Sequence, residues 1–199
     1  MTSEGAPLSF GRMFWGRPIR EIQLLAVVYS VAALVLIVAS VPFPAELNIG
    51  RLLFWGVITA AAVALPVRLP GGVVANLVTA PLLATAFDSS LPQPFAVAWV
   101  AFLGTIEPRD LRRELVWYGS VFNKCNYLLA TSAAWAVIAL TSGTASTGAA
   151  QALLTIMQIA LGGSAFMIVN VTLAVLAASA RTGAPVPVSY THLTLPTKA

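Results

Sequence analysis

Charged residues are scarce in this chain. Only 9% of its 199 residues are Asp, Glu, Lys or Arg, whereas 58% are hydrophobic, and the mean hydropathy is +0.86. A soluble globular domain carries about 25% charged residues, so this sequence has too little polar surface for a soluble fold. A lipid-facing exterior suits such a composition. The sequence therefore predicts an all-α integral membrane protein.

Cysteine and acidic residues are also rare, and each scarcity excludes a class of site. The single cysteine, Cys125, excludes an intrachain disulfide and a multi-cysteine metal site. None of the seven acidic residues lies in the middle of an apolar run, which argues against a proton-coupled carrier or an ion pump. The sequence shows no nucleophile with a plausible general base and no phosphate-binding glycine loop. We therefore expect no enzymatic activity, no cofactor and no metal.

Six apolar runs, separated by short breaks, predict about six transmembrane helices. A helix needs roughly 20 residues to cross about 30 Å of hydrocarbon. The third and fourth runs are short, and one re-entrant hairpin is the alternative for that pair. The fifth has an alternative start near Val121. The runs cover residues 22–41, 52–67, 71–87, 95–106, 127–140 and 152–180.

The cations are distributed unevenly among the breaks between these runs. Arg51 alone lies in the first, third and fifth breaks. The remaining breaks and the two flanks hold Arg12, Arg17, Arg20, Arg68, Arg109, Arg112, Arg113, Lys124 and Arg181. This positive-inside pattern places both termini in the cytoplasm, with or without a hairpin at the third and fourth runs. The cations do not cluster on one face, so the net charge of +4 does not indicate nucleic-acid binding.

Embedded amides are the candidate ligand-binding residues of the predicted bundle. Their default role is interhelical hydrogen bonding, at roughly 0.6 kcal/mol each, and a ligand pocket is the alternative. These candidates are Asn76, Asn123, Asn126, Gln158 and Asn170.

The most polar stretch, residues 104–130, predicts a charged cytoplasmic helix that begins near Pro108. The alternative is a coupling element that passes a change in the bundle to the cytoplasm. The candidate coupling or topology residues are Arg68, Arg109, Asp110, Arg112, Arg113, Phe122, Asn123 and Lys124.

Three short motifs carry a family resemblance over residues 20–180. They are Val67-Arg68-Leu69-Pro70-Gly71-Gly72, the charged loop 109–113, and Phe122-Asn123 ahead of an apolar helix. Together they resemble the multi-span N-terminal membrane regions of bacterial signalling proteins, which precede GGDEF, EAL or HD-GYP domains that make or degrade cyclic di-GMP. The resemblance implies a sensor in the bacterial cytoplasmic membrane, a homodimer and an unidentified small-molecule stimulus. Lys124-Cys125 departs from the small residue or Arg that is more frequent there, and none of the three output-domain motifs occurs in the chain.

The C-terminal residues differ from everything before them. Residues 188–197, VSYTHLTLPT, resemble the translation of a transposase end and adjoining primer from a sequencing library. We therefore exclude residues 188–199 from fold reasoning as an adapter-derived artefact. The expected organisation is a cytoplasmic or interfacial segment at 1–21, a six-helix transmembrane domain at 22–180 and the start of a cytoplasmic linker at 181–187.

Two functions suit these observations. The leading hypothesis is a membrane-embedded sensory or anchoring domain of a longer bacterial signalling protein whose cytoplasmic output domain is missing. The alternative is a small-molecule-binding membrane subunit of a transporter, similar to the substrate-binding component of energy-coupled vitamin importers. A chain that ends soon after Arg181 would favour the subunit, and a chain that continues into a further domain would favour the sensor.

Overall fold

The computed structural model describes residues 19–41, 46–65, 67–68, 74–75, 77–106, 117–142 and 148–183. These residues are almost entirely α-helical, which confirms the predicted all-α class. A two-residue antiparallel pairing of β1 (Val67–Arg68) with β2 (Val74–Ala75) is the exception within this part of the chain. The helices are α2 (Ile19–Ser40), α3 (Ile49–Ala64), α4 (Thr79–Phe87), α5 (Phe95–Leu103), α7 (Trp117–Thr141) and α8 (Ala149–Thr182).

Helix ends follow the local sequence. The Oδ1 atom of Asn48 accepts a hydrogen bond from the Arg51 backbone N–H at 3.0 Å, and this N-cap begins α3. Gly183 ends α8 at a φ of +69°, where its N–H donates to the Ser179 carbonyl at 2.9 Å. Glu21 in the first turn of α2 and Arg181 in the last turn of α8 each have the charge that the helix dipole favours.

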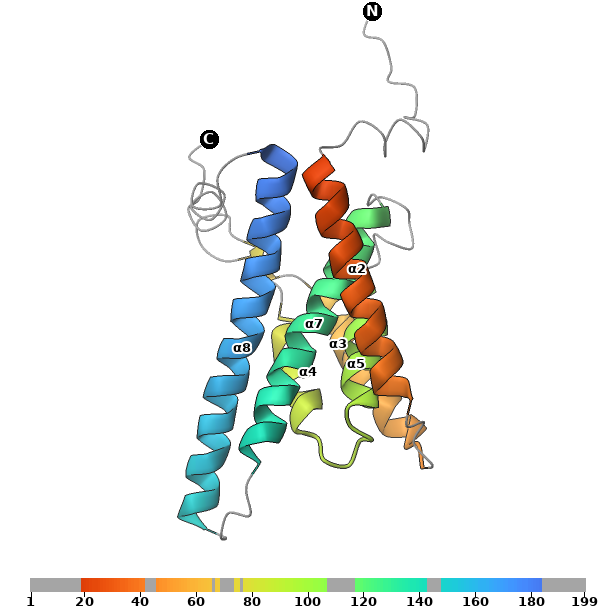
Figure 1. Cartoon of the computed structure of the whole chain (residues 1–199). Coiled ribbons are helices and arrows are strands. Elements are labelled where there is room, and N and C mark those ends of the chain that lie inside the picture. Colours follow the sequence, from red (N-terminus) through yellow and green to blue (C-terminus); the bar gives the residue numbers. More distant parts are fainter. Residues whose placement is uncertain are drawn as a thin grey trace, which may run out of the picture.

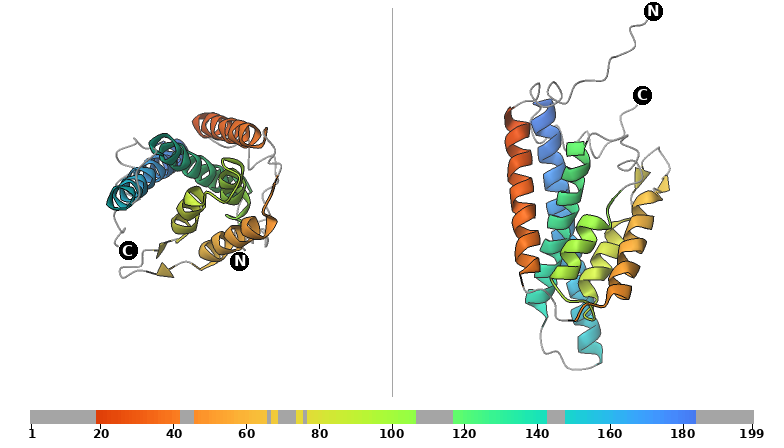
Figure 2. Two further views of the ribbon diagram at one scale, coloured as in Figure 1. Left: turned by 90° about the horizontal axis from the view of Figure 1, so that it is seen from below. Right: turned by 90° about the vertical axis from the view of Figure 1, so that its right-hand side faces the viewer.

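Helix α7 lies at the centre of the bundle. It packs against α8, α5, α2 and α4, and Figure 2 shows it between α2 and α8 on one side and α4 and α5 on the other. The start of α2 and the end of α8 lie at the same end of the molecule, at the top of Figure 1. The turn between α4 and α5 lies at the opposite end. We call these the Glu21 end and the Asp88 end.

Two of the described helices, α2 and α8, are long and apolar enough to cross a membrane. Their outward faces carry large exposed hydrophobic side chains such as Val27, Ile37, Ile156 and Ile168. Helix α3 has 16 residues and carries a similar exposed face that includes Val57. Contiguous apolar surface of this extent marks contact with lipid or protein rather than with water.

The prediction of a continuous helix over residues 71–87 is wrong. Val74 and Ala75 pair with β1, and α4 begins only at Thr79. Pro81 is accommodated because it lies in the first turn of α4, where its missing N–H has no helical partner. Residues 69–73 and Asn76 are outside the described residues.

Six complete crossings are not shown, because α4 and α5 have only nine residues each. At 1.5 Å per residue each is about 14 Å long, roughly half of the hydrocarbon thickness. The two helices pack against each other and against α7. Their lengths fit the alternative of a hairpin better than two full spans.

The first, second and sixth predicted runs correspond to α2, α3 and α8. The start of α7 differs more: it lies at Trp117, ten residues before the predicted 127 and four before the alternative start near Val121. Of the predicted segments at 1–21, 181–187 and 188–199, residues 1–18 and 184–199 lie outside the described part of the chain, as do residues 107–116.

Gly104, the residue that follows α5, lies against Thr59 of α3. A Cβ atom there would lie 2.6 Å from the Val100 carbonyl oxygen and 3.1 Å from the Cβ atom of Thr59, which is fully buried. We expect Gly104→Ala to lower the free energy of unfolding by about 1–3 kcal/mol through overpacking. Thermal unfolding in detergent measures the change.

Gly56→Ala in α3 is the matched control. A Cβ atom at Gly56 has nothing within 4 Å, so this substitution is expected to be neutral or to stabilise the helix by up to about 1 kcal/mol. Equal melting temperatures for the two variants would contradict the close approach at Gly104.

Candidate functional site

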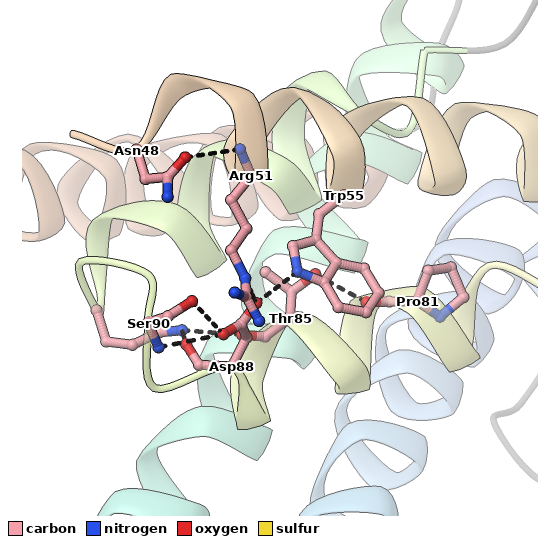
Figure 3. Close-up of polar contacts among 8 residues, drawn as sticks. Asn48, Arg51, Trp55, Pro81, Thr85, Asp88 and Ser90 are labelled. Carbon is pink, nitrogen blue, oxygen red and sulfur yellow. Dashed lines mark hydrogen bonds and ion pairs between the residues drawn. The ribbon is translucent and has the colours of Figure 1, made fainter.

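Asp88, directly after α4, organises the polar contacts at one end of the bundle (Figure 3). Its Oδ2 atom accepts hydrogen bonds from Arg51 Nε at 2.7 Å and from Trp55 Nε1 at 2.8 Å. Its Oδ1 atom accepts from the Ser90 hydroxyl at 2.6 Å and from the Ser90 backbone N–H at 3.1 Å. The side chain of Asp88 is only 7% exposed, whereas that of Arg51 is 50% exposed.

Two opposing effects set the pKa of Asp88. Desolvation by burial raises it, but the hydrogen bonds from Ser90, Trp55 and Arg51 together outweigh burial and lower the pKa from 3.8 to about 2. Asp88 is therefore a carboxylate at any physiological pH. Both of its oxygens are occupied by donors from this chain, so the cluster ties α3 to the α4–α5 turn and has a structural role.

Gln93 extends the same cluster. Its Nε2 atom donates to the Thr85 carbonyl at 2.8 Å and to the Asp88 carbonyl at 3.4 Å. Thr85 in turn donates from Oγ1 to the Pro81 carbonyl at 2.8 Å. These contacts hold the turn between the two short helices α4 and α5.

A cavity of about 420 Å³ lies at the Glu21 end, between α2, α7 and α8. Its apolar wall includes Leu24, Phe122 and Ala174. Its polar lining comes from three helices and comprises Glu21, Ser120, Asn123, Asn126 and Arg181. A concave site with a few convergent polar groups is the usual form of a small-molecule site.

One ion pair crosses this cavity from α2 to α8. Arg181 Nε lies 3.5 Å from Glu21 Oε1. The side chain of Glu21 is 5% exposed, whereas that of Arg181 is 62% exposed. This contact is long and involves an exposed cation, so it joins the two helices less tightly than Asp88 joins α3 to α4.

An amide pair joins α7 to α8 beside the cavity. The Nδ2 atom of Asn126 donates to Asn170 Oδ1 at 2.7 Å and to the Asn170 carbonyl at 3.3 Å. Asn126 is buried, and its own Oδ1 atom has no hydrogen-bond partner in the structure. A buried acceptor without a partner costs about 1–3 kcal/mol, so the α7–α8 contact retains an unmet polar group beside the cavity.

The structure brings together part of the predicted ligand set. Asn123 and Asn126 line the cavity, and Asn170 bonds to Asn126. Gln158 lies elsewhere, where its Nε2 atom donates to the Ile138 carbonyl at 3.4 Å and to Ser142 Oγ at 3.3 Å. Asn76 is outside the described residues.

The predicted coupling residues are only partly described. Phe122 is buried in the core and lines the cavity, and Lys124 Nζ donates to Ser120 Oγ at 2.5 Å. Arg68 lies in β1. Arg109, Asp110, Arg112 and Arg113 are outside the described residues.

Sequence reasoning missed Glu21 and Arg181 as partners, and it missed the whole Asp88 cluster. The sequence did show where these residues lie along the chain. Glu21 is at the start of the first predicted span and Arg181 is at the end of the last one, and at each position the helix dipole favours that charge. Asp88 and Arg51 are opposite charges in two different breaks on the same predicted side of the membrane. Neither signal identifies a pair, because sequence alone does not place those breaks side by side.

Comparisons with known proteins do not identify a family for this chain. No protein-family model, curated protein or solved structure matches the chain. Within the described residues, no group of three or more His, Cys, Asp or Glu side chains could hold a metal ion.

Removal of the Asp88 carboxylate should destabilise the bundle in a pH-dependent way. At neutral pH we expect Asp88→Asn to lower the free energy of unfolding by about 1–3 kcal/mol, because the donors from Arg51, Trp55 and Ser90 lose a charged acceptor. The lowered pKa makes this stabilisation fully present above pH 3.8 and lost as the pH falls through about 2. Thermal unfolding in lipid nanodiscs at several pH values should therefore show the variant and the parent converging at acid pH.

The exposed Glu46 provides the control for that experiment. Glu46→Gln also removes one carboxylate near the Asp88 end and is expected to leave stability unchanged. A pH-independent difference between Asp88→Asn and the parent would contradict the role assigned to the carboxylate.

The Asn126–Asn170 contact predicts a measurable coupling between α7 and α8. A double-mutant cycle with Asn126→Ala and Asn170→Ala should give a coupling energy of about 0.6 kcal/mol, and no more than about 1.7 kcal/mol. Asn123→Ala paired with Asn170→Ala is the control, and additive effects are expected there because Asn123 is exposed. Additivity in the Asn126 cycle would show that the amide pair contributes nothing.

Proposed function

We propose that this chain is the membrane-embedded sensory or anchoring domain of a longer bacterial signalling protein of the cyclic di-GMP type. The domain crosses the bacterial cytoplasmic membrane several times, with the Glu21 end on the cytoplasmic side and an output domain beyond α8. The apolar α2 and α8 and the exposed hydrophobic faces of α2, α3 and α8 support membrane embedding. The short motifs at 67–72, 109–113 and 122–123 support the signalling class.

The observation that carries this proposal is the cavity at the Glu21 end, where the first and last described helices meet. Its volume of about 420 Å³ lies within the range of small-molecule sites. Its charged groups, Glu21 and Arg181, belong to two helices that are far apart in the sequence. A ligand that contacts these groups would bind α2 and α8 at the same time.

Helix α8 provides the route from this cavity to the cytoplasm. It has 34 residues, so it is about 51 Å long and exceeds the thickness of the hydrocarbon. A change in the contact between Arg181 and Glu21 moves the last turn of α8 relative to α2. A stimulus acts in this way only if it binds two arrangements of these helices with different affinity.

The same cavity also suits the second candidate, a small-molecule-binding membrane subunit of a transporter. In that case the cavity holds the transported molecule, and α8 ends the chain instead of leading to an output domain. Both candidates need a ligand at the Glu21 end. They differ in whether an output domain lies beyond Arg181.

Sequencing of the locus separates the two candidates. The codon for Pro187 should be re-read with a library that lacks the adapter resembling residues 188–197. A frame that continues into a GGDEF, EAL or HD-GYP domain is the expected result. A stop codon soon after the codon for Arg181 would overturn the sensor proposal and favour the subunit.

The ion pair at the Glu21 end should control the distance between α2 and α8. Nitroxide labels at Gln23→Cys and Thr182→Cys, in a Cys125→Ala background, report this distance by pulsed electron paramagnetic resonance in nanodiscs. Arg181→Gln is expected to broaden the distribution and move it to longer distances, since it removes the salt bridge across the cavity.

Arg51→Gln is the matched control, because it breaks the ion pair at the Asp88 end. It should leave the distribution between Gln23→Cys and Thr182→Cys unchanged. A distribution that Arg181→Gln also leaves unchanged would mean that the ion pair does not hold the two helices together.

A further inference from the structure

A second hollow lies on the other side of α2 and differs from the polar cavity in its chemistry. This groove has a volume of about 430 Å³ and runs between α2, α5 and α7. Ala33, Phe102, Val121 and Cys125 are among its lining residues, and none of the lining side chains is charged. The groove is therefore suited to an apolar occupant.

The Tyr29 hydroxyl, a polar group in the groove wall, has a partner within the protein. The Tyr29 hydroxyl donates to the Tyr118 carbonyl at 2.6 Å. Burial of an unpaired hydroxyl is costly, and this hydrogen bond satisfies the Tyr29 hydroxyl within the protein. An occupant needs to bring no hydrogen-bonding group.

The groove has the dimensions of one membrane leaflet. Along α2 its lining extends from Ile22 to Leu36, which is about 21 Å at 1.5 Å per residue. Half of the hydrocarbon thickness is about 15 Å. The groove thus begins near the Glu21 end and is long enough to cover the whole depth of one leaflet, about 15 Å, and about 6 Å more.

Small side chains on α2 leave the groove open on the outer surface of the bundle. Ala26 and Ala33 line it and are exposed, whereas Val27 and Leu34, the residues that come after them, are large and about 60% exposed. The missing side-chain volume leaves a channel on one flank of α2. Trp117, 45% exposed, lines the groove near the Glu21 end. Aromatic rings of this kind favour the headgroup level of a bilayer.

We propose that the groove binds one acyl chain of a glycerophospholipid from the leaflet at the Glu21 end, an inference that rests on the proposed membrane embedding. The chain packs against Ala26, Ala33 and Phe102 through van der Waals contacts, which stabilise association within a bilayer. The phosphate lies near Trp117. Arg20, Lys124 and Arg181 outnumber Glu21 among the described charges at this end, which complements an anionic headgroup.

The bound chain connects the groove to the polar cavity. Leu25 and Tyr118 line both spaces. An acyl chain in the groove therefore contacts residues of α2 and α7 that also line the candidate ligand site. Lipid occupancy and ligand occupancy act on the same helix contact.

Photo-crosslinking tests this site directly. The whole chain is placed in nanodiscs that contain a phosphatidylglycerol with a diazirine in the middle of one acyl chain, and the modified residues are mapped by mass spectrometry. We expect adducts to concentrate on α2 from Ala26 to Leu36, on Phe102 and on the Val121–Cys125 turn of α7. Ala33→Phe should fill the groove and reduce these adducts about tenfold, equivalent to about 1.4 kcal/mol in affinity.

Val31→Phe is the control on the same helix, because Val31 is exposed but does not line the groove. It should leave the adducts unchanged. Ala26→Phe is a second variant that fills the groove, and it should reduce the adducts to a similar extent. It replaces Ala33→Phe in the experiment if circular dichroism shows that Ala33→Phe folds poorly. Adducts spread over the exposed faces of α2, α3 and α8, and insensitive to both filling variants, would overturn the site and indicate surrounding lipid only. Failure of the parent chain to insert into bilayers would instead overturn the proposed function.

Discussion

The scarcity of polar surface constrains the position of every charged group in this protein. With only 9% charged residues in the chain, the described charges lie at or near the two ends of the bundle. The interior instead contains neutral amides, of which the Asn126–Asn170 pair joins α7 to α8. Polar groups inside such a bundle need partners because the surroundings supply none. The central helix α7 carries two of the buried polar side chains, Asn126 and Thr131.

The two ends of the bundle use their charges differently. At the Asp88 end the carboxylate accepts four short hydrogen bonds, and the turn that carries it is fixed to α3. At the Glu21 end the ion pair is longer, at 3.5 Å, and a cavity lies beneath it. The described ion pair is therefore shorter and better hydrogen-bonded at the Asp88 end than at the Glu21 end.

The sequence predicts the long helices well, because hydropathy over about 20 residues decides them. It fails at residues 71–87, where a short β-pairing takes Val74 and Ala75, which hydropathy assigned to a span. It also places the start of α7 too late. Polar residues such as Asn123 and Lys124 interrupt the apolar run, although packing against α2 and α8 keeps the segment helical.

The candidate site was predictable only in its residue types. Embedded amides indicate interhelical hydrogen bonds, but the rotation of each helix decides that Asn126 meets Asn170 while Gln158 does not. Glu21 and Arg181 are 160 residues apart in sequence, and their contact depends on how α2 and α8 fold onto α7. The Asp88 cluster joins α3 to the α4–α5 turn for the same kind of reason.

The most direct test of the account is the sidedness of the two ends. Ser89→Cys and Thr182→Cys, each in a Cys125→Ala background, place a single exposed thiol at the Asp88 end or the Glu21 end. In intact cells a membrane-impermeant maleimide should label Ser89→Cys and leave Thr182→Cys unlabelled, and inverted membrane vesicles should give the reverse. Labelling of both thiols from the same side would contradict a bundle that spans the membrane between its Asp88 end and its Glu21 end.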